Sequence, residues 1–269
     1  MQIATWNVNS IRTRLDHVLT WLDSGGGKDV GVLCLQETKV TDEQFPQEAF
    51  RDRDLHVYFY GQKSYNGVAL VAREPLADIQ MGFSAVLDSE VARSLDEQKR
   101  VIAASWREAN ILNLYVPNGS EVGSEKYEYK LTWLQTLRAY LDARSIAGNP
   151  VSLICGDFNV ALEDRDIHNP DGKETHIMSS PVEREALRAA VLDLEFRDAF
   201  RKFVADGGHY SWWDYRRGGF ARDRGWRIDH HYLAPDLYDR ATTCTIDREP
   251  RGWEKPSDHT PVIVELANS

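Results

Sequence analysis

The nine residues of Val151–Asn159, which read VSLICGDFN, constrain the fold of this chain more than any other stretch. The first five are apolar or small, and such a run predicts a short strand that is buried on both faces. Gly156 ends the run, and Asp157 and Asn159 follow it directly. Polar side chains at the end of a buried strand lie where open α/β sheets usually carry their sites. A plain turn is the alternative interpretation, because Gly, Asp and Asn also favour turns.

Short apolar runs alternate with helical patterns along the rest of the 269 residues. Further strands are predicted at 3–6, 30–35, 56–60, 67–72, 101–106, 111–116, 232–234, 242–246 and 262–266. Helices are predicted at 11–22, with Ser10 as its cap, at 127–144 and at 182–194, and a polar loop is predicted at 164–180. Because both halves mix strands with helices, we expect an α/β (α+β) four-layer sandwich of two packed mixed β-sheets flanked by helices. No linker or repeat divides the sequence, so residues 1–269 are predicted to form a single domain.

The net charge of the chain is −10, which is the wrong sign overall for a protein whose partner is nucleic acid. A local basic face, or an acidic cleft that holds a cation, is compatible with that total. The first ten residues, MQIATWNVNS, do not form a signal peptide, and no apolar run approaches the ~20 residues that span a bilayer. Three cysteines without a CxxC pair indicate buried thiols in a reducing compartment. We therefore expect a cytoplasmic protein that does not interact with membranes.

Polar residues recur at the ends of the predicted apolar runs. They are Asn7, Glu37, Tyr115, Asn118, Asp157, Asn159, Asp229, Asp258 and His259. Each has an ordinary explanation, such as a cap, a turn, an ion pair or a buried histidine, but the repetition of a strand followed by an acid or amide favours a shared site. Two carboxylates ~4 Å apart repel by ~4 kcal/mol at an effective dielectric constant of about 20, so acids that converge must bind protons or a cation. Oxygen ligands without a Cys/His set favour Mg²⁺ or Mn²⁺ over zinc, and such an ion suits the attack of water on a phosphodiester.

Six short motifs occur in order along the chain. They are WNVNSIR at 6–12, LQETK at 35–39, YVPNG at 115–119, GDFN at 156–159, WRID at 226–229 and SDH at 257–259. This series resembles that of the exonuclease III family, the apurinic/apyrimidinic endonucleases and 3′-to-5′ exonucleases of the endonuclease/exonuclease/phosphatase superfamily. LQET, GDFN and SDH are superfamily-level signals, whereas YVPNG together with WRID is more specific. The resemblance extends over residues 1–266 and so covers nearly the whole chain.

The resemblance implies that oxygen- and nitrogen-bearing side chains surround a divalent ion. Glu37 is implied to hold the principal ion, with Asn7 and Asp258 nearby. The full candidate set for the metal is Asn7, Glu37, Asp157, Asn159, Asp258 and His259. Asn9 lies where some relatives carry Asp, and because it is neutral we assign it only an indirect role.

The resemblance also implies which residues carry out the reaction. Asp157 is implied to position and activate the attacking water, with support from Asn159. His259 is implied to contact the scissile phosphate while Asp229 holds its imidazole. The phosphate oxygens are implied to receive hydrogen bonds from Tyr115, a catalytic candidate, and Asn118, a substrate-binding candidate.

An aromatic and arginine-rich segment at 210–228 is the candidate DNA-facing surface. Its second half carries five arginines against a single acid: Arg216, Arg217, Arg222, Arg224 and Arg227. Clustered aromatic rings usually belong to the core, and arginines are usually solvated. When the two alternate on a glycine-containing loop, however, the rings also suit stacking on bases or sugars and the arginines suit neutralisation of phosphates. In the family, aromatics at the positions of Trp212 and Trp226 line the pocket for a base-less sugar, an apolar box that a flipped-out nucleotide needs. Arg216 and Lys126 are further substrate-binding candidates, and Lys130 is considered for a contact with the DNA backbone.

The function that these observations predict is a Mg²⁺- or Mn²⁺-dependent DNA-repair nuclease that acts as a monomer. It is expected to cleave duplex DNA on the 5′ side of abasic sites and to trim 3′ ends, with 3′-to-5′ exonuclease activity. Another phosphodiesterase or phosphatase of the same superfamily, acting on RNA or on lipids, is the first alternative. A DNA-binding homologue that has lost activity is the second, and the presence of every motif residue argues against it.

Overall fold

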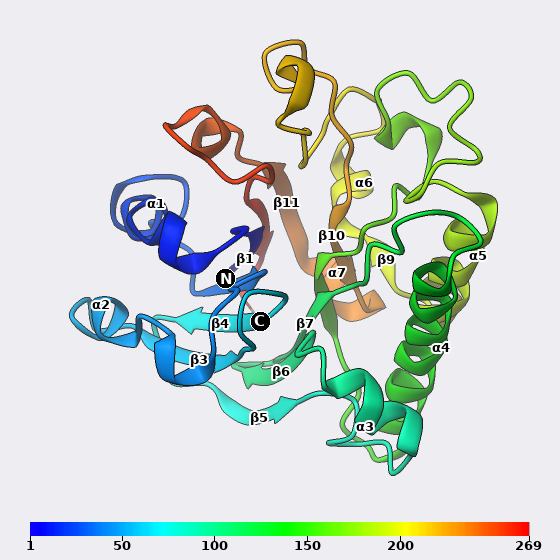
Figure 1. The fold of residues 1–269 in the computed structure, drawn as a ribbon. Coiled ribbons are helices and arrows are strands. Elements are labelled where there is room, and N and C mark those ends of the chain that lie inside the picture. Colours follow the sequence, from blue (N-terminus) through cyan, green and yellow to red (C-terminus); the bar gives the residue numbers. More distant parts are fainter. Residues whose placement is uncertain (269) are drawn as a thin grey trace.

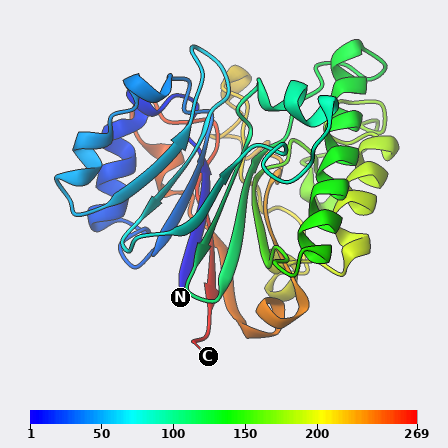
Figure 2. The same cartoon turned by 90° about the horizontal axis from the view of Figure 1, so that it is seen from below.

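Two six-stranded β-sheets pack face to face at the centre of the structure, and helices cover the outer face of each sheet (Figure 1). The computed structural model describes residues 1–268. The helices that flank the sandwich are α1 (Ile11–Ser24), α2 (Gln47–Arg51), α4 (Glu125–Ile146) and α5 (Pro181–Ala190). Figure 2 shows the layers in succession, with α1 and α2 outside one sheet and α4 and α5 outside the other. The predicted four-layer sandwich of mixed sheets is therefore confirmed.

The first sheet is built from both ends of the chain. Its strands are β1 (Gln2–Asn7), β2 (Val32–Gln36), β3 (His56–Tyr60), β4 (Val68–Ala72), β11 (Ala241–Ile246) and β12 (Val262–Leu266). They lie in the order β11-β12-β1-β2-β4-β3. The central pair β1–β2 is parallel, and the other neighbouring pairs are antiparallel.

The second sheet repeats this pattern with the middle of the chain. Its strands are β5 (Ala77–Met81), β6 (Val101–Trp106), β7 (Ala109–Tyr115), β8 (Leu153–Asp157), β9 (Arg197–Asp198) and β10 (Asp229–Leu233). They lie in the order β5-β6-β7-β8-β10-β9. Here β7 and β8 form the parallel pair, and the helix α4 connects them. Each sheet thus has one parallel pair at its centre.

Alternate side chains of the central strands enter two different cores, because successive residues of a strand point to opposite faces. In β2, Cys34 joins the core between the sheets, whereas Leu33 and Leu35 join the core beneath α1. On the far side, Leu134 of α4 packs in one cluster with Ile154 of β8. The burial of both faces explains the nearly continuous apolar runs in the sequence.

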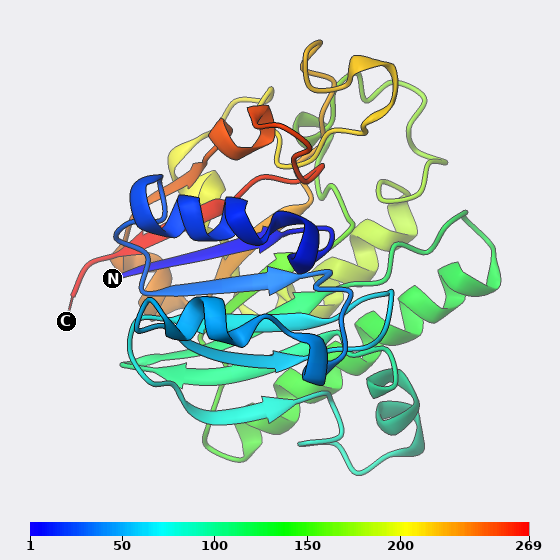
Figure 3. The ribbon, with the colours of Figure 1, turned by 60° about the vertical axis from the view of Figure 1, so that its left-hand side comes forward.

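The strands β1, β2 and β8 end at the same rim of the sandwich. Asn7 is the last residue of β1 and Asp157 the last of β8, and Asn7 Nδ2 donates to Asp157 Oδ2 at 2.9 Å. The antiparallel strand β10 begins there with Asp229, which pairs with Asp157 in the ladder. His259 precedes β12 and arrives from the same direction. Met1 and the end of β12 lie together at the opposite end of the sandwich, where the amino group of Met1 donates to the Leu266 carbonyl (Figure 3).

Gly156 does not end strand β8, as the sequence suggested, because β8 continues to Asp157. The backbone of Gly156 has φ +143°, and a Cβ there would lie 1.9 Å from the carbonyl oxygen of Leu114 in β7. Only glycine therefore permits the close pairing with β7 that places Asp157 opposite Tyr115.

Most differences from the predicted elements concern short or peripheral segments. Helix α1 buries the expected face, but Ser10 has φ 96° and makes no side-chain capping bond. The predicted helix at 182–194 ends as α5 at Ala190, and a short 3₁₀ turn follows at Leu192–Leu194. The elements that the sequence did not reveal are β5, α2, β9, α3 (Glu90–Asp96), α6 (Ala199–Phe203) and α7 (Pro235–Arg240). None of the helices within residues 1–268 combines the length and apolarity needed to cross a bilayer.

Candidate active site

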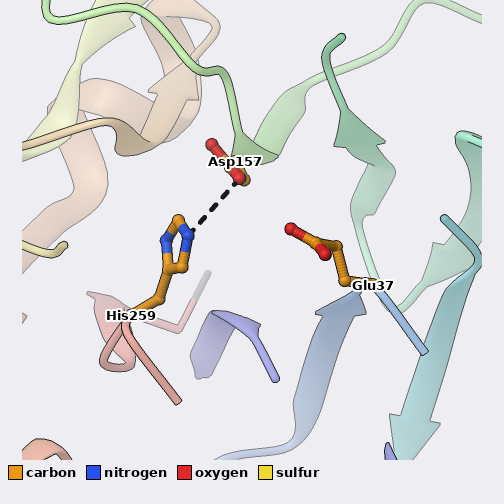
Figure 4. Close-up of side chains that lie close together, drawn as sticks. All are labelled: Glu37, Asp157 and His259. Atoms are coloured by element: carbon orange, nitrogen blue, oxygen red, sulfur yellow. Dashed lines mark ion pairs between the residues drawn. The ribbon is translucent and has the colours of Figure 1, made fainter. Parts of the chain in front are cut away.

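Three side chains from distant parts of the chain converge at the rim: Glu37, Asp157 and His259 (Figure 4). One potential ligand atom from each lies within 4.8 Å of the others. Glu37 directly follows β2 with φ +53°, a left-handed conformation that is uncommon for Glu and that turns the chain away from the strand. Strained backbone of this kind is frequent at functional sites. The predicted convergence of Glu37, Asp157 and His259 is therefore observed.

The amide of Asn7 holds the two carboxylates in place. Its Nδ2 donates to Glu37 Oε1 at 2.8 Å and to Asp157 Oδ2 at 2.9 Å. Its Oδ1 accepts the backbone N–H of Asn9 at 3.0 Å. Asn7 thus presents donors, not its oxygen, to the space between the two acids, and the prediction that it binds the metal directly stays a prediction.

His259 is held by a carboxylate on one side and faces another. Its Nδ1 lies 2.9 Å from Asp229 Oδ2, and its Nε2 lies 3.7 Å from Asp157 Oδ2. Ser211 Oγ donates to Asp229 Oδ2 at 2.6 Å and so fixes the acid that orients the imidazole. Burial works against the charged imidazole, but the carboxylates of Asp229 and Asp157 outweigh it and raise the pKa of His259 to about 10. His259 is therefore an imidazolium at neutral pH, with an N–H on each ring nitrogen.

Asp157 is the buried acid of the cluster, with 1% of its surface exposed. Burial raises its pKa to about 7, Asp229 and Glu37 add to the rise, and His259 and Asn7 oppose it. A carboxyl group with this pKa exchanges a proton readily near neutral pH. The same excess of negative charge would be offset by a divalent cation.

The end of β7 and the loop after β8 bring the remaining catalytic candidates to the same place. Asn159 donates its backbone N–H to Asp157 Oδ1 at 2.9 Å, and its Oδ1 accepts from Asn118 Nδ2 at 3.0 Å. Tyr115 lies beside Glu37, and burial together with that carboxylate raises the pKa of its phenol, which therefore stays protonated. The guanidinium of Arg100 lies 4.5 Å from the centre of the Tyr115 ring. Hydroxyl, amide and guanidinium donors thus line one side of the site.

Asp258 lies at the same rim, and each of its two oxygens accepts a hydrogen bond from a neighbouring side chain. Its Oδ1 accepts from Asn9 Nδ2 at 2.9 Å and its Oδ2 from Trp212 Nε1 at 2.9 Å. Asp258 does not belong to the three-residue group of possible metal ligands found within residues 1–268. Lys39, to which the sequence gave no role, pairs with Glu37 Oε2 at 2.7 Å and also donates to Asn9 Oδ1.

The substrate-binding candidates flank this centre on two sides. Trp212 is partly exposed beside His259, with ring centres 6.5 Å apart, whereas Trp226 is 7% exposed and packs with Ile177 and Met178. Arg216 is exposed and pairs with Asp214. On the other side, Lys126 lines a cleft of about 430 Å³ together with Tyr65, Arg100, Tyr115 and Asn118.

Two basic residues considered for the DNA-facing surface are buried. Lys130 is 0% exposed and pairs with Glu183, so it neither faces water nor offers the contact with a DNA backbone that was considered for it. Arg227 is 1% exposed and pairs with Asp166 and Asp198, so it does not belong to the DNA-facing arginines. The sequence predicted the helix that carries Lys130 and the loop that carries Arg227. It gave no sign that acids from distant parts of the chain would pair with these two residues.

Several residues of the site were missed from the sequence. Lys39 is the last residue of the LQETK motif, and its place in that motif could have indicated that it belongs to the site. Ser211, which holds Asp229, stands in the aromatic segment without any pattern that distinguishes it. Arg100 directly precedes β6 and reaches Tyr115 only because β6 and β7 are neighbours.

Known proteins resemble this chain over nearly its full length. Residues 4–259 match the endonuclease/exonuclease/phosphatase family. The chain is 34% identical over 277 residues to exodeoxyribonuclease III of Haemophilus influenzae, covering 99% of this chain and 100% of the relative. It is 32% identical over 270 residues to an exodeoxyribonuclease of Bacillus subtilis, covering 97% of this chain and 98% of the relative.

Solved structures show the same likeness. An AP endonuclease from Archaeoglobus fulgidus superposes with a TM-score of 0.91 at 39% identity, covering 100% of both chains. A 3′-5′ exonuclease from Neisseria meningitidis superposes with a TM-score of 0.90 at 36% identity, covering 99% of both chains.

Proposed function

The chain belongs to the exonuclease III branch of the endonuclease/exonuclease/phosphatase family, and from this premise we propose that it is a metal-dependent DNA-repair nuclease that hydrolyses phosphodiesters at abasic sites and at 3′ ends. The observation that carries the proposal is the convergence of Glu37, Asp157 and His259 at one rim of the sandwich. These groups combine a cation-binding acid, a proton acceptor and a cationic hydrogen-bond donor, a combination that suits phosphodiester hydrolysis.

The donor set of the cluster fits a hard divalent cation. Glu37 and Asp157 supply carboxylate oxygens, and residues 1–268 place no cysteine among the possible ligands. Such ligands favour Mg²⁺ or Mn²⁺, and we propose that Glu37 and Asp157 hold the ion. A protonated His259 has no free lone pair, so it does not serve as a ligand while it is charged. When bound, the ion offsets negative charge on the phosphate and lowers the pKa of nearby water.

The protein groups around this ion have separate tasks in hydrolysis. Asp157 accepts the proton from the attacking water as the new bond to phosphorus forms and the bond to the leaving oxygen breaks. Asn159 fixes the Asp157 carboxylate through its backbone N–H. The imidazolium of His259, which Asp229 orients, donates to a phosphate oxygen that gains charge in the transition state.

Donors on the opposite side complete the cradle for the phosphate. The neutral phenol of Tyr115 and the amide of Asn118 are available to non-bridging oxygens, because both line the cleft beside the cluster. Arg100 and Lys126 in the same cleft carry the positive charge that a neighbouring phosphate of the strand requires. The overall charge of −10 is thus compatible with DNA binding, since basic residues gather locally.

The abasic sugar is proposed to lie against Trp212, close to His259. Trp212 offers a partly exposed ring there, and Trp226 forms the apolar wall behind it with Met178. Arg216 lies on the adjoining loop and would neutralise a flanking phosphate. Removal of a terminal 3′-phosphate uses this wall less, because no sugar follows the phosphorus in that substrate.

Cleavage of a duplex with one abasic site in the presence of Mg²⁺ tests the proposal. We expect incision on the 5′ side, loss of incision in EDTA, and recovery on adding Mg²⁺ or Mn²⁺. A parallel duplex that carries a 3′-phosphate reports on 3′-end trimming. No cleavage of either substrate at any divalent ion concentration contradicts the assignment. The same assays with RNA and lipid phosphodiesters address the alternatives within the family.

We further propose that residues 1–269 act as one domain, as a monomer and in the cytoplasm. Three free, buried cysteines, Cys34, Cys155 and Cys244, support a reducing compartment. Light scattering tests the monomer, and cell fractionation tests the compartment.

A further inference from the structure

Two buried hydrogen bonds join the two sheets directly below the rim, and we propose that the side chains that form them are positioning residues of the site, a role that rests on the proposed function. The first inter-sheet bond runs from Gln36 of β2 to Asn113 of β7. The second runs from His231 of β10 to the backbone carbonyl of Val262 in β12. Together they fix the offset between the sheets, and thereby the alignment of the site residues that each sheet supplies.

Both halves of the site combine residues from the two sheets. Glu37 follows β2 of the first sheet, and Tyr115, which lies beside it, ends β7 of the second. His259 precedes β12 of the first sheet, and Asp229, which orients its imidazole, begins β10 of the second. The core between the sheets consists mainly of apolar side chains, whose burial has no preferred direction. Hydrogen bonds require a defined distance and angle, so they restrict sliding of one sheet over the other.

Backbone carbonyls determine the direction of the first inter-sheet bond. Asn113 Nδ2 donates to the carbonyls of Leu35 in β2 and Ala69 in β4, both at 3.0 Å, and a carbonyl can only accept. The Oδ1 of Asn113 must therefore face Gln36, whose Nε2 donates to it at 2.7 Å. Gln36 Nε2 also lies 2.9 Å from Thr5 Oγ1. Asn113 is thus bonded to two strands of the first sheet while it belongs to the second.

The first inter-sheet bond lies next to the site residues. Gln36 directly precedes Glu37, and both Gln36 and Asn113 are 0% exposed. Asn113 and Tyr115 lie two positions apart in β7 and so on the same face of the strand. A shift of β7 relative to β2 would therefore change the position of the Tyr115 phenol relative to the Glu37 carboxylate.

The second inter-sheet bond has the same relation to the other half of the site. His231 is 0% exposed, and its Nε2 lies 3.0 Å from the carbonyl oxygen of Val262. Because that oxygen can only accept, the proton is on Nε2. His231 lies two positions after Asp229, on the same face of β10, and Val262 lies three positions after His259. The bond therefore lies directly below the pair of Asp229 and His259.

Both inter-sheet bonds leave a buried acceptor without a partner. Gln36 Oε1 and His231 Nδ1 accept from no group within residues 1–268. An unpaired buried acceptor destabilises a fold, and an apolar side chain of similar size would avoid that effect. Stability alone therefore does not account for these two polar side chains, whereas alignment of the site does.

Crystal structures of variants test the inference without relying on activity. Gln36→Met and Asn113→Leu each remove the first inter-sheet bond and nearly preserve side-chain volume. We expect Glu37 and Tyr115 to move relative to one another by about 1 Å, a displacement that can lower a rate by about 10²-fold. Ile111→Ala is the matched control, because Ile111 belongs to the apolar core on the same face of β7, two positions farther from the rim.

The inference is overturned if Glu37 and Tyr115 keep their places in both variants, or if they move as far in Ile111→Ala. If Asn113→Leu does not fold, Gln36→Met decides, because it keeps the bonds from Asn113 to the backbone of the first sheet.

Mn²⁺ affinity and kinetics supply readouts that a loss of stability alone does not change. Because Asn113 is not a proposed ligand, it affects the ion only through the position of Glu37. Asn113→Leu should weaken Mn²⁺ binding by about tenfold, as for other residues that orient metal ligands, measured by electron paramagnetic resonance of the free ion. It should also lower kcat on the abasic duplex by about 10²-fold. Ile111→Ala should lower stability but leave both values unchanged while it is folded, and equal effects of the two variants contradict the inference.

Combined variants distinguish the two inter-sheet bonds. The double variant of Gln36→Met and Asn113→Leu should have a kcat no lower than the worse single variant, because both changes remove one bond. His231→Leu should lower kcat by about tenfold, and its effect should multiply with that of Asn113→Leu, because the two bonds share no partner. Multiplied effects within the first pair contradict the inference. If the wild-type protein cleaves no DNA, the proposed function fails, whereas the crystal structures still decide whether these side chains align the rim.

Discussion

Replacement of Lys130 by Met removes a buried cation on which two loops of the site depend. Lys130 and Glu183 are both 0% exposed and form an ion pair through Lys130 Nζ and Glu183 Oε1. The same ammonium group donates to the carbonyls of Asn159 at 2.8 Å and Asn118 at 3.2 Å. Burial lowers the pKa of Lys130, although the Glu183 carboxylate works in the opposite direction.

The magnitude follows from what Lys130→Met leaves behind. Loss of one partner from a buried ion pair costs about 3–5 kcal/mol, because the other charge stays buried without compensation. Two carbonyl groups also lose a charged donor. Against a total stability of about 5–15 kcal/mol, we expect the free energy of unfolding to fall by about 4 kcal/mol. Since Asn159 holds the Asp157 carboxylate, kcat should fall as well at temperatures where the variant is still folded.

Urea unfolding of a small set of variants measures this effect. Lys126→Met is the matched control, because Lys126 is exposed on the same helix and its loss should change stability by less than about 0.5 kcal/mol. The double variant Lys130→Met with Glu183→Leu should lose less than the sum of the two single losses, since neither charge remains unpaired. The reasoning is refuted if Lys130→Met costs under about 1 kcal/mol, or if the two losses add.

Three further changes probe other parts of the site and the core. Asp157→Asn should lower kcat on an abasic duplex by about 10²–10³-fold with little effect on folding. Initial rates measure the change in kcat, and circular dichroism measures folding. A loss of kcat below threefold would show that Asp157 is not the proton acceptor. His231 is buried and neutral, and burial lowers its pKa to about 4, whereas the value expected in the unfolded chain is 6.5. The contribution of neutral His231 to stability is therefore complete above pH 6.5. It falls by about 3 kcal/mol as the pH drops to 4. Chemical denaturation across this range should show a shallower dependence for His231→Gln, and an identical slope would contradict the assignment. Arg216→Ala should weaken duplex binding and reduce the salt dependence of log Kd by about one unit, measured by fluorescence anisotropy in a salt series, whereas an unchanged slope removes Arg216 from the phosphate contacts.

The sequence predicted those parts of the fold whose side chains repeat with a clear period. Strands such as β3 and β12 were predicted with the observed bounds, because both are short runs rich in aromatic or β-branched residues. The edge strand β5 was missed, since only Ile79 and Gln80 are even half-buried and its apolar pattern is therefore weak. Gly156 was misinterpreted as a break because sequence gives no sign that a neighbouring backbone approaches it so closely.

The candidate site could be predicted in composition but not in its internal connections. Convergence of Glu37, Asp157 and His259 followed from acids and a histidine at strand ends, which a sandwich gathers at one rim. The direction of each hydrogen bond depends on rotations that sequence does not reveal, so the turn of Asp258 toward Trp212 and Asn9 could not be foreseen. Lys130 could not be placed correctly either, because its partner Glu183 lies 53 positions away.

A crystal soaked in Mn²⁺ and measured for anomalous scattering is the most direct test that this rim binds a catalytic cation. We expect one strong peak within bonding distance of the carboxylate oxygens of Glu37 and Asp157. A crystal with no peak at saturating Mn²⁺, or with its strongest peak away from both carboxylates, would contradict the account.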